Sequence, residues 1–202
     1  MEKFRPQELK KLCKPAHKSA GEDNGQITII GGSSLFHGAP ILSLKVASRI
    51  VDMVFFSSPE PSVGKVAEEI KSKLSSFVWV PWEEVEEYLK KSDAILIGPG
   101  FMRFRSESIP EEEKLSCDEA CRETKKITEG LLQKFPDKKW VIDAGSLQVM
   151  DPTLIPEGAI LTPNKEEYEI LFGNLSPKEA TKKFKCIIVL KGPTTRVVSA
   201  EK

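Results

Sequence analysis

Five short segments with ligand-binding chemistry each follow directly on an apolar run of the chain. Glycine-rich turns can present backbone amides to an anion, and aspartate, glutamate, lysine and threonine supply groups that bind metal ions or phosphates. In chain order the segments are GGS (31–33), GPG (98–100), DAG (143–145), TPNKEE (162–167) and KGPTT (191–195). These residue types favour a small-molecule ligand.

The two glycine-rich segments each have two interpretations. GGS could form a concave nest of N–H groups for an anion or a ring amide, with the helix that contains Pro40 behind it. Its spacing matches neither a P-loop nor the dinucleotide fingerprint, so a tight turn explains it equally well. GPG lets a ligand approach the backbone at Gly98 and Gly100, or it is only a turn.

The acidic candidates are Asp143 and Glu167. Asp143 ends the apolar run WVID, and isolated burial of a carboxylate costs roughly several kcal/mol, so we interpret it as a site residue. Asn164 and Glu167 are three residues apart, which on the first turn of a helix directs both to the same side. Glu167 could hold Mg²⁺ through water beside a phosphate, or it could complement the helix dipole.

The last segment combines a cation, a glycine and two hydroxyls. Lys191, Gly192, Thr194 and Thr195 suit a polyphosphate. The alternative is a charged hairpin turn, in which case TTRVVS (194–199) is the second strand of the hairpin.

The elements around these segments predict a layered α/β fold. From Gln26 onward, apolar runs alternate with amphipathic segments in a chain of 202 residues. The expected strands are ITII (27–30), MVFFS (53–57), FVWV (77–80), AILIG (94–98), WVIDAG (140–145), AILTP (159–163) and CIIVLKG (186–192). The expected helices cover 7–13, 40–50, 63–74, 83–91, 111–134, 165–173 and 176–184.

Strands that are apolar throughout are typical of a mainly parallel sheet that is buried on both faces. In such a sheet ligands bind at the carboxyl ends of the strands, so the five segments should meet at one edge.

Composition narrows the function class. Thirty basic residues balance thirty acidic ones, which disfavours nucleic acid and anionic membranes as partners. Residues 1–24 form a polar leader, and we find neither a secretory signal nor a run long enough to span a membrane. The four cysteines are scattered, so we interpret them as reduced thiols of a cytoplasmic protein: Cys13, Cys117, Cys121 and Cys186.

The order of the motifs is more specific than any one of them. GGS…GAP, IGPG, DAG-x-L, LTPN-x-x-E and VLKG-x-x-T follow one another between residues 26 and 199. In this order the sequence resembles the NAD(P)H-hydrate dehydratase family, whose fold is ribokinase-like. The resemblance implies a three-layer α/β/α domain over 25–202. It also implies an enzyme that uses ADP or ATP, with Mg²⁺, to remove water from hydrated NAD(P)H by phosphorylation and elimination.

The resemblance also implies roles for individual residues. Asp143 would support catalysis, and Glu167 would bind Mg²⁺ through water. Substrate contacts would come from Gly32, Ser33, Ala39, Gly98, Gly100 and Asn164. The phosphates of the adenine nucleotide would be held by Lys191, Gly192, Pro193, Thr194 and Thr195.

Two departures from the family pattern change these expectations. Asn164 stands where the family commonly has histidine, and Asn-x-x-Glu is typical of ribokinase-like sugar and vitamin kinases. A small-metabolite kinase and a non-catalytic nucleotide-binding module are therefore the alternatives.

The family's Gly-x-Gly-Asp motif is absent after KG-x-x-T, because the sequence ends at Lys202. We therefore expect a C-terminally incomplete fold, no catalytic base and no activity of this chain by itself. An uncovered sheet edge beside the last strands predicts a homo-oligomer.

Overall fold

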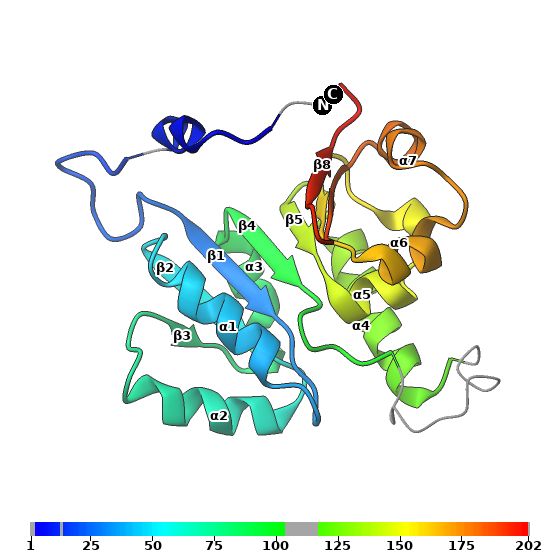
Figure 1. Ribbon diagram of the computed structural model, residues 1–202. Helices are drawn as coiled ribbons and strands as arrows, with labels where there is room; N and C mark the ends of the chain where they lie inside the picture. The colour runs from blue at the N-terminus through cyan, green and yellow to red at the C-terminus, as the bar shows by residue number, and fades with distance from the viewer. Residues whose placement is uncertain (1–2, 13, 104–116, 202) are drawn as a thin grey trace.

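The computed structural model describes residues 3–12, 14–103 and 117–201, which form a mainly parallel eight-stranded sheet with helices on both faces (Figure 1). The strand order is β3-β2-β1-β4-β5-β6-β7-β8, and only β8 runs antiparallel to its neighbour within the described part of the chain. The strands are β1 (Gln26–Ile30), β2 (Met53–Ser57), β3 (Val78–Trp79), β4 (Ala94–Ile97), β5 (Lys139–Ile142), β6 (Ile160–Leu161), β7 (Ile187–Leu190) and β8 (Arg196–Val198).

The predicted alternation of strands and helices is confirmed. The helices are α1 (Gly38–Ala47), α2 (Pro61–Lys71), α3 (Val85–Lys91), α4 (Glu119–Lys134), α5 (Ala144–Val149), α6 (Lys165–Phe172) and α7 (Pro177–Phe184). Short 3₁₀ helices are η1 (Pro6–Lys11), η2 (Trp82–Glu84) and η3 (Pro152–Leu154). The short helix α5 was not expected, because six residues are too few to show a helical period.

Several helix boundaries differ from the expected ones. The helices α1, α2 and α3 are shifted by two or three residues at one or both ends. The first predicted helix is the 3₁₀ helix η1 instead of 7–13, and Cys13 lies outside the described residues. The long helix α4 begins at Glu119, where Asp118 caps it by accepting a hydrogen bond from the Cys121 amide at 2.9 Å. The expected start at 111 lies outside the described residues.

Adjacent residues of β1 belong to the two separate cores of the domain. Ile29 packs in a cluster with the inner faces of α1 and α2, whereas Ile30 belongs to a cluster that includes residues of α3, α4 and α5. Both isoleucines are fully buried. Because side chains alternate across a strand, this apolar run requires helices on both sides. Figure 1 shows α1 across one face of β1 and α3 behind it.

The far half of the sheet is covered less evenly. One face of β5, β6 and β7 contributes Trp140, Ile142, Leu161 and Ile188 to the core. On the opposite face four apolar side chains are only half-buried and belong to neither core cluster: Val141, Ile160, Ile187 and Val189. The homo-oligomer expected from an uncovered edge beside β7 stays a prediction, and β8 forms that edge here.

Two of the helices start with capping boxes. The box predicted at Ser176 and Glu179 is present on α7, with Pro177 at the first helical position. Hydrogen bonds from the side chain and the backbone of Ser176 lower the pKa of Glu179. The predicted C-cap glycine of α6 is Gly173, which has a φ of 59°. These caps fix the two ends of the loop between α6 and α7, and α7 is followed by β7.

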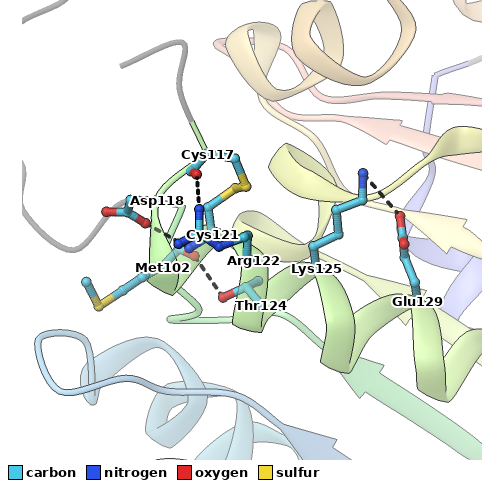
Figure 2. The surroundings of a disulfide bond; sticks show 8 residues. All are labelled: Met102, Cys117, Asp118, Cys121, Arg122, Thr124, Lys125 and Glu129. Carbon is cyan, nitrogen blue, oxygen red and sulfur yellow. Dashed lines mark hydrogen bonds and ion pairs between the residues drawn. A yellow bond between two sulfur atoms is a disulfide. The ribbon is translucent and has the colours of Figure 1, made fainter. Parts of the chain in front are cut away.

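The cysteine prediction is wrong for two residues, because Cys117 and Cys121 form a disulfide (Figure 2). A spacing of four places both on the same side of the α4 N-terminus, with Cα atoms 5.2 Å apart. Cys186 is a free, buried thiol. The cysteines therefore give no support to a reducing compartment, and a cytoplasmic location stays a prediction. No helix of the described residues has the length and apolar content of a membrane span.

The carboxyl ends of β1, β4 and β5 touch through glycines. A Cβ atom on Gly31 would lie 2.2 Å from the Pro99 carbonyl oxygen, and one on Gly98 would lie 2.0 Å from the Asp143 carbonyl oxygen. A Cβ atom on Gly145 would lie 2.3 Å from the Phe101 oxygen. Only glycine fits these positions, so the three loops are packed backbone against backbone.

The turn between β5 and α5 is strained. Ala144 has a φ of 47°, in the left-handed region that costs a residue with a Cβ about 1–2 kcal/mol. It stands between Asp143 and the glycine that packs on the Phe101 carbonyl. The surrounding contacts therefore hold a backbone conformation that the residue itself disfavours.

We predict that Ala144→Gly raises the free energy of unfolding by up to about 1 kcal/mol, because glycine adopts a positive φ without strain. Urea denaturation measures this value. The control is Ala67→Gly in the middle of α2, which should lower the free energy of unfolding by about 1 kcal/mol or more. A loss of stability in both variants would contradict strain at Ala144.

We predict that reducing the disulfide lowers the free energy of unfolding by about 2 kcal/mol, the chain-entropy value for so short a loop. Urea denaturation with and without dithiothreitol measures the change. A Cys117→Ser/Cys121→Ser variant should show no response to the reductant. Four reactive thiols in the unreduced, denatured protein, the full cysteine content of the sequence, would show that the pair is not oxidised.

Candidate functional site

A polar cluster lies at the carboxyl ends of β5, β6 and β7. Its centre is the Asp143 carboxylate, whose Oδ1 accepts hydrogen bonds from Thr162 Oγ1 at 2.7 Å and from Lys191 Nζ at 2.7 Å. The side chains of Asp143 and Lys191 are 25% and 43% exposed, so the ion pair remains open to a ligand from solvent. Two predicted site residues from separate strand ends, Asp143 and Lys191, thus meet, together with Thr162 from a third strand end.

Glu167 borders the same cluster from the first turn of α6. Its Oε2 accepts a hydrogen bond from the Asn164 amide at 2.8 Å, and Asn164 Oδ1 accepts one from the Glu167 amide at 2.9 Å. This capping box confirms that Glu167 complements the N-terminus of its helix. Lys191 Nζ lies 3.8 Å from Glu167 Oε2 and Gln148 Nε2 lies 3.4 Å from Oε1, so the buried carboxylate has polar neighbours on both oxygens.

One lysine therefore serves two carboxylates. The group formed by Asp143, Glu167 and Lys191 carries a net charge of −1 when all three are ionised. It would therefore repel a polyphosphate that binds without a cation. A divalent cation or a movement of Lys191 toward the phosphates would offset that repulsion.

The KGPTT segment forms the turn of a β-hairpin. β7 pairs with β8 in antiparallel register, with Leu190 opposite Arg196, so residues 191–195 are the connecting loop. The hairpin interpretation is thereby confirmed. The Lys191 amide donates to the Pro163 carbonyl at 2.8 Å, which ties this loop to the end of β6. The loop is exposed throughout, and phosphate binding by Gly192, Pro193, Thr194 and Thr195 stays a prediction.

The GGS segment is a tight turn, which is one of its two predicted interpretations, and its amides do not form an open anion nest. Its three amides already donate to backbone carbonyls within the protein. The acceptors are Ser57 at 3.4 Å, Pro99 at 2.8 Å and Phe36 at 3.3 Å. Gly32 has a φ of 93°, which explains the glycine at that position.

A cavity of about 270 Å³ opens beside the GGS turn. Gly32 and Ser33 lie on its wall together with residues from the β4 exit, the start of α2 and the start of α4. These further residues are Ser34, Pro59, Glu60, Phe101, Met102, Glu119, Ala120, Glu123, Thr124 and Ile127. Thr124 Oγ1 donates to the Met102 carbonyl at 2.8 Å, which fixes α4 against the β4 exit (Figure 2).

Four predicted substrate residues lie outside this cavity lining: Ala39, Gly98, Gly100 and Asn164, the last of which caps α6 beside the Asp143 cluster. Ala39 is exposed in the first turn of α1. Gly98 packs on the β5 exit, and a Cβ atom on Gly100 would lie 2.6 Å from the Phe36 carbonyl oxygen. The GPG segment is thus a turn packed between loops, and its contact with substrate stays a prediction.

Sequence reasoning missed Thr162, Gln148 and the residues of α4. A hydroxyl directly after the β6 strand was a readable signal for Thr162, because it occupies the same strand-exit position as Asp143. No signal was available for Glu119, Glu123 and Thr124, since only the packing of α4 brings them to the cavity.

Comparison with known proteins agrees with this geometry. A family model described as NAD(P)H-hydrate dehydratase matches residues 27–202. A bifunctional NAD(P)H-hydrate repair enzyme of Methanocaldococcus jannaschii is 32% identical over 195 residues, which cover 92% of this chain and 35% of that protein. An ADP-dependent (S)-NAD(P)H-hydrate dehydratase of Nitrosopumilus maritimus is 27% identical, with 88% of this chain and 62% of that protein covered.

Solved structures share the fold. A ribokinase-like superfamily protein of Enterococcus faecalis superposes with a TM-score of 0.73 at 19% identity, over 98% of this chain and 68% of that one. An ADP/ATP-dependent NAD(P)H-hydrate dehydratase of Bacillus subtilis, co-crystallised with ATP and Mg²⁺, gives a TM-score of 0.60 at 20% identity, over 89% and 64%. The fold is therefore ribokinase-like.

The chain spans little more than a third of the length of the first curated relatives that it matches. Within that span the family model covers the sheet and all five strand exits that build the site. On this evidence the chain belongs to the NAD(P)H-hydrate dehydratase family.

Proposed function

We propose that the natural protein repairs hydrated NAD(P)H by ADP- or ATP-dependent dehydration. The observation that carries the proposal is the Asp143, Thr162 and Lys191 cluster, which joins three strand exits beside an exposed hairpin loop rich in phosphate-binding groups. Two relatives named for the repair or dehydration of NAD(P)H hydrate support this choice of substrate.

The nucleotide phosphates would bind at the loop of residues 191–195. Lys191 would exchange part of its contact with Asp143 for a phosphate oxygen, because its ammonium lies at the edge of the cluster and is partly exposed. The hydroxyls of Thr194 and Thr195 and the backbone of Gly192 suit the same phosphates, and Pro193 would shape the turn between them.

Mg²⁺ is part of the proposal, and the residues present fit it as an outer-shell site. The described residues contain no group of three His, Cys, Asp or Glu side chains that could hold a metal ion. We therefore do not propose that the protein alone coordinates Mg²⁺ directly. Asp143 and the capping carboxylate of Glu167 are oxygen donors of the kind that hold Mg²⁺ through water beside phosphates. A bound Mg²⁺ would supply charge neutralisation for the phosphoryl group.

The substrate would enter the cavity beside the GGS turn. Its volume of about 270 Å³ is below the roughly 300–1,000 Å³ of pockets that enclose a drug-sized ligand, so it would take one end of a dinucleotide. Phe101 offers an apolar surface, and Ser33 and Thr124 offer hydroxyls, which suits a hydrated nicotinamide ring and its amide. Contacts at Ala39, Gly98, Gly100 and Asn164 are part of the same proposal.

In the proposed reaction the nucleotide transfers its terminal phosphoryl group to the hydroxyl at C6 of the ring. The C–O bond then breaks and phosphate leaves, while the ring nitrogen lone pair supports the new double bond and a proton is released. Charge neutralisation and alignment are the main demands of phosphoryl transfer. Lys191, with a bound Mg²⁺, would supply the neutralisation, and Asp143 would help to align the reacting groups.

The proposal also includes the location, the partners and the oligomeric state of the protein. The balanced charge of the chain disfavours binding to nucleic acid or membranes, and a cytoplasmic location is part of the same proposal. The half-buried face of β5 to β7 and the β8 edge favour a homo-oligomer.

We predict that Lys191→Ala lowers the affinity for Mg²⁺·ADP about 10- to 100-fold, the range expected for a hydrogen bond to a charged group. Isothermal titration calorimetry of this chain measures the affinity. The matched control is Lys185→Ala, which removes a surface lysine paired with Glu157 away from the site and should leave affinity unchanged. Equal affinities of the Lys191 variant and the unmodified chain would refute the phosphate role.

We predict that the full-length protein restores the near-ultraviolet absorbance of NADH from hydrated NADH when ADP or ATP and Mg²⁺ are present. One phosphate should be released for each NADH formed, as measured by a phosphate assay. No recovery with either nucleotide would contradict the proposal.

A small-metabolite kinase is the second candidate, favoured by the Asn164 and Glu167 capping box in the Asn-x-x-Glu form of such kinases. It differs in the product: a stable phosphate ester would accumulate, visible by mass spectrometry with vitamin-precursor alcohols and sugars as substrates. Nucleotide binding without either product would identify a non-catalytic binding module.

A further inference from the structure

The Asp143 side chain is turned away from the helix that it precedes. Asp143 occupies the N-cap position of α5 with an extended backbone, φ −135° and ψ 162°. An aspartate at this position ordinarily accepts a hydrogen bond from an amide of the first helical turn. Here the carboxylate makes no such bond, and its hydrogen bonds go to Thr162 and Lys191 instead.

We propose that Thr162 is the positioning residue that holds the Asp143 carboxylate in the site and off the α5 N-terminus. Thr162 follows β6, which pairs with β5 in the sheet, and its amide donates to the Ile142 carbonyl at 3.1 Å. The two residues are therefore fixed side by side by the sheet before any side-chain contact forms.

The hydroxyl of Thr162 has one proton to donate and two acceptors within reach. Asp143 Oδ1 lies at 2.7 Å and the Ile142 carbonyl oxygen at 3.4 Å, so the carboxylate is the closer partner. The bond to an ionised acceptor is also the stronger kind. Thr162 thus selects one orientation of the carboxylate.

Lys191 is not suited to this positioning role. Its ammonium is carried on a flexible stem in an exposed hairpin loop, and the proposed function requires it to move toward phosphate. Thr162 is partly buried, short and stiff about its first side-chain torsion. The threonine therefore retains the carboxylate when the lysine leaves.

The selected orientation has a consequence for the ligand. Both observed bonds fall on Oδ1, and no described residue donates a hydrogen bond to Oδ2. Oδ2 is the oxygen left for a ligand or for the water shell of a cation. Without Thr162 the carboxylate would turn back to the α5 amides and cap the helix.

The structural test compares Thr162→Val, which keeps the side-chain shape, with Thr162→Ser, which keeps the hydroxyl. Both variants are made in a Lys191→Ala background, because Lys191 also holds the carboxylate at 2.7 Å. In crystal structures of the full-length protein, the valine variant should then show the Asp143 carboxylate on the α5 amides, and hydrogen exchange of the Gly145 and Ser146 amides should slow. The serine variant should match the Lys191→Ala protein. An unmoved carboxylate in the valine variant overturns the proposal.

The functional test rests on the proposed dehydration and uses a double-mutant cycle. Thr162→Val should lower kcat/KM for hydrated NADH about 10- to 100-fold, and Thr162→Ser should restore most of it. In an Asp143→Asn background the valine substitution should change kcat/KM less than about twofold, because Thr162 acts only through that carboxylate. Equal losses in both backgrounds would show a merely structural role and overturn the proposal.

The matched control is Thr153→Val. Thr153 Oγ1 donates to Asp151 Oδ1 at 2.7 Å, the same type of pair at the start of η3, away from the site, so its loss should leave kcat/KM unchanged. If the protein does not dehydrate hydrated NADH, the proposed function fails, and the crystal structures and hydrogen exchange of the Thr162 variants still decide the positioning role.

Discussion

Backbone-to-backbone contact between three loops is the constraint on which the rest of the site depends. The exits of β1, β4 and β5 approach so closely that a Cβ atom at Gly31, Gly98 or Gly145 would lie within 2.3 Å of a carbonyl oxygen of the neighbouring loop. A side chain at any of these positions would separate the loops, and with them the cavity wall and the start of α5. The strand order places the three exits side by side. The absence of side chains at the three glycines allows their backbones to pack in direct contact.

In the turn after β5, two residues adopt arrangements that their local preferences disfavour. Ala144 adopts a positive φ, and Asp143 gives up a helix cap that is typically worth about 1 kcal/mol. Both arrangements direct the same carboxylate outward to Thr162 and Lys191. Backbone strain and an unused helix cap at two adjacent residues are typical of functional sites, where tertiary contacts outweigh local preferences.

The site divides into two regions with different chemistry. The cluster around Asp143 combines carboxylates with a lysine and lies beside an exposed loop. The cavity beside the GGS turn has apolar and hydroxyl groups on its wall together with three carboxylates, those of Glu60, Glu119 and Glu123. The glycine contacts bridge the two, since the β4 exit touches both the GGS turn and Asp143. A nucleotide at the first region and a ring at the second would thereby share one rigid edge of the sheet.

The sequence by itself determined the alternating elements, the mainly parallel sheet, the capping box at Ser176 and the five exits that carry the site. These follow from apolar periodicity, from cap spacing and from the rule that parallel strands end at one edge, all of which are local or topological. It also determined the family, because the order of the motifs can be read from the sequence alone.

Only the tertiary structure decided which atoms meet. The GGS amides are occupied by backbone carbonyls, Cys117 and Cys121 are paired, and α4 supplies cavity residues, because each outcome depends on the packing of segments distant in sequence or on the exact path of a turn. The same holds for Thr162: its hydroxyl was visible in the sequence, but its partner was set by the pairing of β5 with β6.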